Sequence, residues 1–242
     1  PSDNLPAAQY RDLPAAPSWK SLVGPSVLLL GLSLGSGEFV LWPYITYKFG
    51  FVVFWACMVG VTTQYFLNME IERWSLATGE TALTGFCRLW KHWAWIFLLC
   101  NVIPWVWPGW ASGAATLLTW ELGGESEGIR VLYSIGSLIA IGLALTLGPV
   151  VYNTVERIQI VLVALVLIFL VVIFFLVVEW AHIVDMFKGI GNIGYIPEDM
   201  ELPLLLGAIA FAGAGGTMNL AQSDFVREKG YAMGHYIGRL TS

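Results

Sequence analysis

Two glycine-rich stretches, each beside polar side chains, are the parts of this sequence best suited to chemistry. Gly35-Ser36-Gly37 leads into Glu38 within one apolar run, and Gly213-Ala214-Gly215-Gly216 leads into Thr217 and Asn219 within another. A carboxylate in a membrane-length apolar segment is costly to bury and by default marks an ion or proton path. Helices interrupted by glycine free backbone carbonyls and helix ends, which can then become ligands. The predicted chemistry is binding of a cation or small solute, with Glu38 as the charged group of the site. If the cation is a metal, Glu38 is the predicted metal ligand. The full candidate set is Gly35, Ser36, Gly37, Glu38, Gly215, Gly216, Thr217 and Asn219.

Each of these features also has a purely structural explanation. Small residues allow two membrane helices to approach closely, so the glycines could serve packing alone. Glu38 could instead lie hydrated near the outer interface. Other polar side chains either line a cavity or hydrogen-bond a neighbouring helix: Thr63, Gln64, Asn219, Gln222 and Ser223.

The elements that position these residues are predicted to be transmembrane helices. Hydrophobic residues make up 57% of the 242-residue chain and charged residues 12%, against about 25% charged in ordinary soluble domains. About 20 apolar residues cross a bilayer as a helix, and only helices or closed barrels satisfy the backbone there. Barrel strands would be shorter and would alternate in polarity. Runs without Asp, Glu, Lys or Arg reach that length at 49–69, 92–120, 131–155, 158–178 and 202–223.

Six helices follow from these runs and from the residues that separate them. A tail, 1–20, precedes a bundle at 21–226, and 227–242 begins a cytoplasmic connection. Pro104 and Pro108 predict a kink in the third helix, and 180–201 is predicted to be a loop. The first and sixth helices contain the glycine interruptions, as expected if helices one to five form one repeat and helix six opens the second. The predicted helices are about 22–47, 51–76, 93–119, 129–147, 151–179 and 202–226.

The distribution of basic residues orients the chain. Lys and Arg concentrate on the cytoplasmic side of membrane proteins. With the N-terminus inside, only three of the 12 basic residues fall outside, namely Lys48, Arg130 and Lys188. The outer loops are acidic. We therefore expect a multi-pass protein with a cytoplasmic N-terminus, in the plasma (inner) membrane of a prokaryote.

Several function classes find little support. The net charge of −5 does not favour a nucleic-acid partner, and no cofactor is predicted apart from a divalent cation as substrate. Cys57, Cys87 and Cys100 form no metal-ligand or disulfide pattern. A membrane enzyme would need clustered catalytic side chains, but the histidines stand near predicted helix ends: His92, His182 and His235.

Several stretches resemble the Nramp (natural resistance-associated macrophage protein) family of divalent-metal transporters. Gly24-Pro25 opens the first helix as in that family, and 35–39 falls where the family has Asp-Pro-Gly-Asn-Phe. Gln64-Tyr65 followed by 77–79 resembles the end of its second helix. Val151-Tyr152 with Glu156 resembles the start of its fifth. In the sixth helix, 216–220 falls where the family has Met-Pro-His-Asn-Leu. The likeness extends from about Gly24 to Arg239 and implies an all-α, leucine-transporter-type bundle of two inverted five-helix repeats.

The departures from the family pattern concern the metal ligands. The family holds its metal with an aspartate and an asparagine of the first motif and a methionine of the second. By the likeness of the motifs, these ligand positions correspond to Gly35, Glu38 and Gly216 in this chain. The soft thioether that favours transition metals is therefore missing. The acidic residues of the family's third helix are also missing between Trp93 and Trp120. The resemblance thus implies a divergent Nramp-related branch, in which a hard cation such as magnesium suits an oxygen-only site better than manganese or iron.

We expect a secondary-active transporter that works by alternating access, its six helices completed by the remaining C-terminal helices of a longer parent chain. Its partners would be the lipid bilayer and the transported cation or small solute. Two alternatives stay open. The same architecture can carry an amino acid or amine, and a degenerate transporter fold can act as a non-transporting sensor.

Overall fold

The computed structural model describes residues 5, 11–18, 26–27, 30–31, 33–34, 37–106, 109–124, 126–147, 151–213 and 215–237. Every regular element among these residues is helical. The chain forms two compact units, one made of 1–91 with 159–242 and the other of 92–158.

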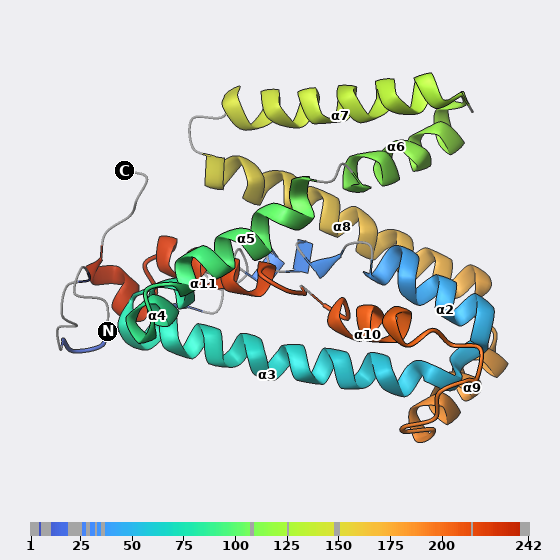
Figure 1. Cartoon of the computed structure of the whole chain (residues 1–242), viewed down its shortest axis with the longest axis horizontal. Helices are drawn as coiled ribbons and strands as arrows, with labels where there is room; N and C mark the ends of the chain where they lie inside the picture. The colour runs from blue at the N-terminus through green and yellow to red at the C-terminus, as the bar shows by residue number, and fades with distance from the viewer. Residues whose placement is uncertain are drawn as a thin grey trace. The chain divides into compact units, whose positions relative to one another are not determined.

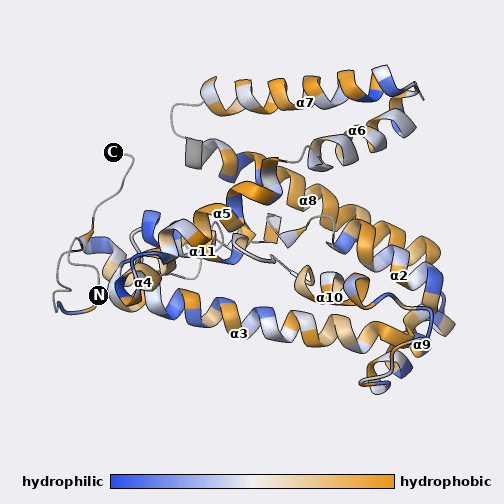
Figure 2. Ribbon diagram, viewed as in Figure 1, coloured by the Kyte–Doolittle hydropathy of each residue, from blue (hydrophilic) through white to orange (hydrophobic). Residues whose placement is uncertain are grey.

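Four helical segments in the described ranges are long and apolar enough to cross a membrane. This is typical of a multi-pass membrane protein. Figure 2 shows the clearest case, α8 (Val151–Val177), which is hydrophobic along most of its length. Its large side chains, such as Ile168 and Phe175, are exposed, and helices of this kind satisfy their backbone internally in lipid. The four segments are Glu38–Thr78, Trp93–Leu122, Glu127–Leu147 and Thr154–Val177.

The first unit is built around α3 (Phe54–Thr78), whose 25 residues span about 37 Å at 1.5 Å per residue. Helices α10 (Leu202–Ala210) and α11 (Met218–Glu228) both pack against it, as Figure 1 shows. A buried apolar cluster joins α2 (Trp42–Phe49), the short 3-10 helix η2 (Gly50–Val53), α3 and α10. Its members are Ile45, Val53, Ala56, Met200, Leu205 and Ala208.

The chain directions within this unit follow from its paired residues. Leu205 packs beside Val53 and Ala56, whereas Ser223 bonds to Ala82, so α10 and α11 run parallel to α3. By contrast, Glu38 bonds to Gly213, beyond the end of α10, whereas Ile45 shares a buried cluster with Met200 and Leu205. Figure 1 shows α2 and α10 running in opposite directions. The segment of η1 (Gly37–Leu41, a π-helix) and α2 therefore runs antiparallel to α10.

The N-terminal end of α3 carries a helix where a loop was predicted. α9 (Trp180–Gly191) packs against η2 and α3. The loop prediction for 180–201 was therefore wrong for its first half. Glu179 and His182 form a reciprocal capping box at the start of α9, and Lys188 pairs with Asp185 at 2.9 Å. These local interactions stabilise a short helix that lacks the apolar length of a membrane span.

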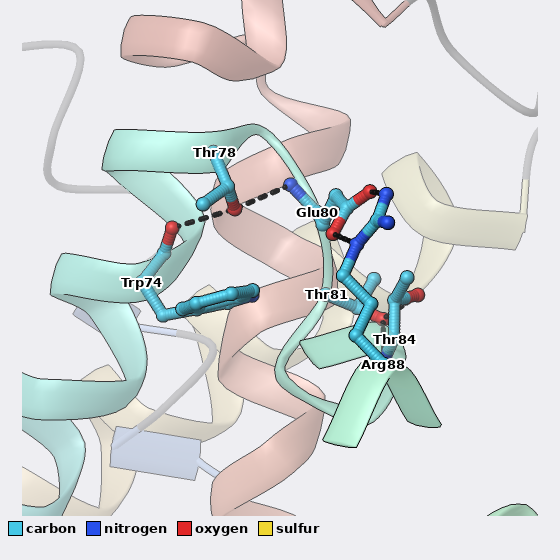
Figure 3. Close-up of polar contacts among 6 residues, drawn as sticks. All are labelled: Trp74, Thr78, Glu80, Thr81, Thr84 and Arg88. Carbon is cyan, nitrogen blue, oxygen red and sulfur yellow. Dashed lines mark hydrogen bonds and ion pairs between the residues drawn. The ribbon is translucent and has the colours of Figure 1, made fainter. Parts of the chain in front are cut away.

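The C-terminal end of α3 turns into α4 (Ala82–Leu89) through a polar junction shown in Figure 3. Thr78 Oγ1 accepts from the Glu80 N–H at 3.1 Å, and Thr81 caps α4 by accepting from the Thr84 N–H at 3.3 Å. Arg88 reaches back to Glu80, with Nε 2.7 Å from Oε2, and this hydrogen bonding raises the pKa of Arg88. The 3-10 helix η3 (Ala232–Tyr236) packs at the same end, against α3 and α11.

The second unit contains α5 (Trp93–Val106), α6 (Gly109–Leu122) and α7 (Glu127–Leu147). Pro104 lies within α5, and α6 begins at Gly109, consistent with the predicted interruption of this span. Pro108 itself lies outside the described residues. α6 and α7 pack against each other, and the Ser134 hydroxyl of α7 lies 3.3 Å from the Ala111 carbonyl oxygen of α6 and 3.0 Å from the Arg130 carbonyl oxygen of its own helix.

Candidate functional site at the break between α10 and α11

The interruption predicted in segment 202–226 is present in the structure. α10 ends at Ala210 and α11 begins at Met218. Gly213, Gly215 and Gly216 have φ angles of 118°, 50° and 60°. These values lie in the left-handed region that side chains disfavour, so glycine is the residue best able to adopt them. The local sequence therefore ends one helix and starts another inside a single apolar segment.

Glu38 from η1 reaches this break. Its Oε1 accepts a hydrogen bond from the Gly213 N–H at 3.0 Å, across 175 residues of sequence. The carboxylate is half-buried. A backbone N–H released by the break thus bonds an acid that directly follows the other glycine-rich stretch of the sequence.

Gln64 in the middle of α3 bridges the two ends of the break. Its Nε2 donates to the Ala210 carbonyl at 3.2 Å, and its Oε1 accepts from Asn219 Nδ2 at 2.7 Å. Ala210 is the last residue of α10 and Asn219 lies in the first turn of α11. Because a carbonyl can only accept, Ala210 sets the orientation of the Gln64 amide, which in turn sets that of Asn219.

A close helix contact at Gly60 positions Gln64. A Cβ at Gly60 would lie 2.6 Å from Cβ of Ala212 and 2.8 Å from the Ile209 carbonyl oxygen. Any larger residue would therefore push α3 away from the break. Gln64 stands one turn after Gly60, on the same face of the helix. The small residue brings the backbones together, and the amide one turn later spans them.

The polar contact between α3 and α11 continues beyond the break. Gln222 Nε2 donates to Glu72 Oε1, and Ser223 Oγ accepts from the Ala82 N–H at 3.0 Å. The Asn219, Gln222 and Ser223 side chains are 1%, 4% and 0% exposed. The sequence predicted that these polar residues either line a cavity or hydrogen-bond a neighbouring helix, and the structure shows such hydrogen bonds. Thr63, by contrast, bonds to Val59 of its own helix.

The candidate residues predicted from sequence have the following places. Glu38, Gly215, Gly216 and Asn219 come together at the break, and Thr217 directly precedes α11. Gly37 begins η1. Gly35 and Ser36 lie outside the described residues.

Sequence reasoning missed two polar residues of α3, Asn68 and Glu72. With Gln64 and Ser75 they recur at intervals of four, four and three residues, which places all four on one face of the helix. That spacing was a signal that could have identified them.

The atoms at the break that could coordinate a cation are oxygens. In the part of the chain that the structure describes, no three His, Cys, Asp or Glu side chains gather as a metal cluster. A cation at the break would have Glu38 as its carboxylate, with carbonyl oxygens and water as further ligands. Such a set suits a hard cation that keeps part of its hydration shell.

Comparisons with protein-family models, curated proteins and solved structures found no match.

Proposed function

We propose that this protein is a secondary-active membrane transporter of the Nramp-like kind, and that its substrate is a divalent cation. The observation that carries the proposal is the bond from the Gly213 N–H to the Glu38 carboxylate. It joins the only acid inside the first predicted helix to the glycine break of the sixth. Two glycine-interrupted helices at matching positions of two repeats are the usual mark of a substrate site in inverted-repeat transporters.

The chain directions support an inverted repeat. Repeats related by an axis in the membrane plane place their first helices antiparallel to each other. The opposite directions of the η1–α2 segment and α10, with Glu38 bonded to Gly213 beyond the end of α10, support this relationship. We therefore propose that η1–α2 and α10–α11 are the equivalent broken helices of a leucine-transporter-type bundle.

The ligand types favour a hard cation such as magnesium over manganese or iron. Transition metals are selected by soft sulfur ligands. Gly216, at the position where the Nramp pattern has methionine, offers only backbone. Carboxylate, carbonyl and water ligands suit magnesium, which gives up its water reluctantly.

The proposed orientation has the C-terminal end of α3 in the cytoplasm. Arg88 of α4 lies at this end, and α11 approaches it with Arg227 in its last turn. The opposite end carries α9 and the acidic residues Glu198, Asp199 and Glu201. This arrangement agrees with the positive-inside rule and with a cytoplasmic N-terminus.

Uptake by the full-length protein in proteoliposomes tests the proposal. Magnesium, manganese and an amino-acid panel are offered to wild type, to Glu38→Gln and to the matched control Glu70→Gln. Glu70 is an exposed acid of α3 paired with Arg73. The proposal predicts magnesium uptake that is lost in Glu38→Gln and kept in Glu70→Gln.

The other outcomes of this assay separate the alternatives. Uptake of an amino acid or amine without any metal would replace the substrate and keep the transporter. Metal uptake indifferent to Glu38→Gln would remove Glu38 as the ligand. No transport of any of these solutes would favour a non-transporting sensor and overturn the proposal.

A further inference from the structure

Several buried polar atoms of α3 and α11 have no hydrogen-bond partner among the described residues. Three are amide oxygens, Asn68 Oδ1, Asn219 Oδ1 and Gln222 Oε1, one is the Ser75 hydroxyl, and one is a donor, Nε of Arg227. A buried acceptor without a donor is destabilising, because the loss of its hydrogen bonds to water is not compensated. Several of them in one interface are therefore expected only where something else satisfies them.

The orientation of each α11 amide follows from a group that can only accept. Gln222 must direct its Nε2 to the Glu72 carboxylate, so its Oε1 points elsewhere. Asn219 must direct its Nδ2 to Gln64, since Gln64 is itself oriented by the Ala210 carbonyl. Turning either amide around would place two acceptors against each other.

These oxygens belong to neighbouring turns of two packed helices. Asn219 and Gln222 are three residues apart on α11, and Asn68 and Glu72 are four apart on α3, so each pair lies on one helix face. Asn68 stands one turn from both Gln64 and Glu72, the partners of Asn219 and Gln222. Asn219 and Gln222 are 1% and 4% exposed.

We propose that this interface is a second cation site, distinct from the one at Glu38. Its ligands would be the Asn68, Asn219 and Gln222 amide oxygens together with the Glu72 carboxylate. Three neutral oxygens and one negative charge suit a hard metal cation of low charge, such as sodium, better than a soft metal. The cation would satisfy the amide oxygens that meet no donor among the described residues and would link α11 to α3 next to the break.

Thermal unfolding of the full-length protein in nanodiscs tests this site. Unfolding midpoints are measured in sodium, magnesium and choline chloride at equal ionic strength, because a ligand that binds only the folded state raises the midpoint with its concentration. Wild type, Glu72→Gln and Glu70→Gln are compared. Glu72→Gln keeps an acceptor for Gln222 but removes the charge, and Glu70→Gln makes the same change on the exposed side of α3.

If this site binds sodium, the unfolding midpoints of wild type and of Glu70→Gln should be higher in sodium chloride than in choline chloride. In Glu72→Gln the sodium concentration needed for the same shift should rise at least about tenfold, because the only charged ligand is gone. A second variant, Asn68→Leu, should weaken the sodium effect even if Glu72→Gln folds poorly. Glu38→Gln should retain it, so failure of the proposed transport would not be confused with failure of this site.

Two results would overturn the proposal. One is an equal midpoint in sodium and in choline, whatever magnesium does, which would mean that water alone satisfies these oxygens. The other is a sodium effect of unchanged concentration dependence in both Glu72→Gln and Asn68→Leu.

Discussion

Gln64→Leu is the substitution whose cost can be worked out most fully from the structure. It removes a donor to Ala210 and an acceptor from Asn219. Each hydrogen bond contributes about 0.5–1.5 kcal/mol net, and about 0.6 on average between membrane helices. The Asn219 Nδ2, nearly fully buried, is left without its acceptor, which adds about 1–3 kcal/mol. We expect the free energy of unfolding to fall by about 2–4 kcal/mol.

A double-mutant cycle with Asn219→Leu measures the coupling directly. Removing both partners of a buried bond is far less costly than removing one. The double variant should therefore be about 1–2 kcal/mol more stable than the sum of the single losses predicts. The measurement is reversible unfolding by SDS in mixed micelles. Thr63→Val is the control. Among the described residues, this hydroxyl bonds within its own helix, to the Val59 carbonyl at 2.8 Å, so the substitution should cost less than about 0.5 kcal/mol. Losses that add within about 0.5 kcal/mol would refute the bridge.

Two further predictions concern packing and orientation. Gly60→Ala should destabilise the fold by about 1–3 kcal/mol in the same SDS assay, because its Cβ meets Ala212 and Ile209. Gly136→Ala in α7, where a Cβ meets nothing within 4 Å, should be neutral or slightly stabilising, and equal losses at both sites would contradict the close contact. In a cysteine-free background in whole cells, an impermeant maleimide should label Glu198→Cys and leave Glu228→Cys unlabelled until the membrane is opened. The reverse pattern would overturn the orientation.

The membrane helices could be predicted from sequence because their signal is local. Twenty apolar residues without charge are enough to specify a span, and the predicted ends of 51–76 and 129–147 fall within a few residues of α3 and α7. The break was predictable for the same reason, since a cluster of glycines ends a helix wherever it occurs. α9 was missed because its stability comes from capping and ion pairing, which a search for apolar length does not detect.

The two glycine-rich stretches were grouped into one candidate site from their matching positions, but the individual contacts of the site could not be predicted, because they are long-range. Glu38 and Gly213 are 175 residues apart, and Gln64 and Asn219 are 155 apart. The sequence around each of these residues does not indicate which distant residue it contacts. The shared helix face of Asn68 and Glu72 was visible in their spacing, but that spacing alone does not say which helix this face meets. The buried acceptor oxygens emerge only once α11 is placed against α3.

In the proposed function, the Glu38 carboxylate is the charged ligand of the transported cation. Infrared difference spectroscopy of the full-length protein in lipid, on adding magnesium, tests it most directly, since metal coordination shifts the carboxylate stretching bands. The account predicts a magnesium-induced carboxylate band in wild type and Glu70→Gln that disappears in Glu38→Gln. An unchanged band in Glu38→Gln would mean that magnesium binds elsewhere and would contradict the account.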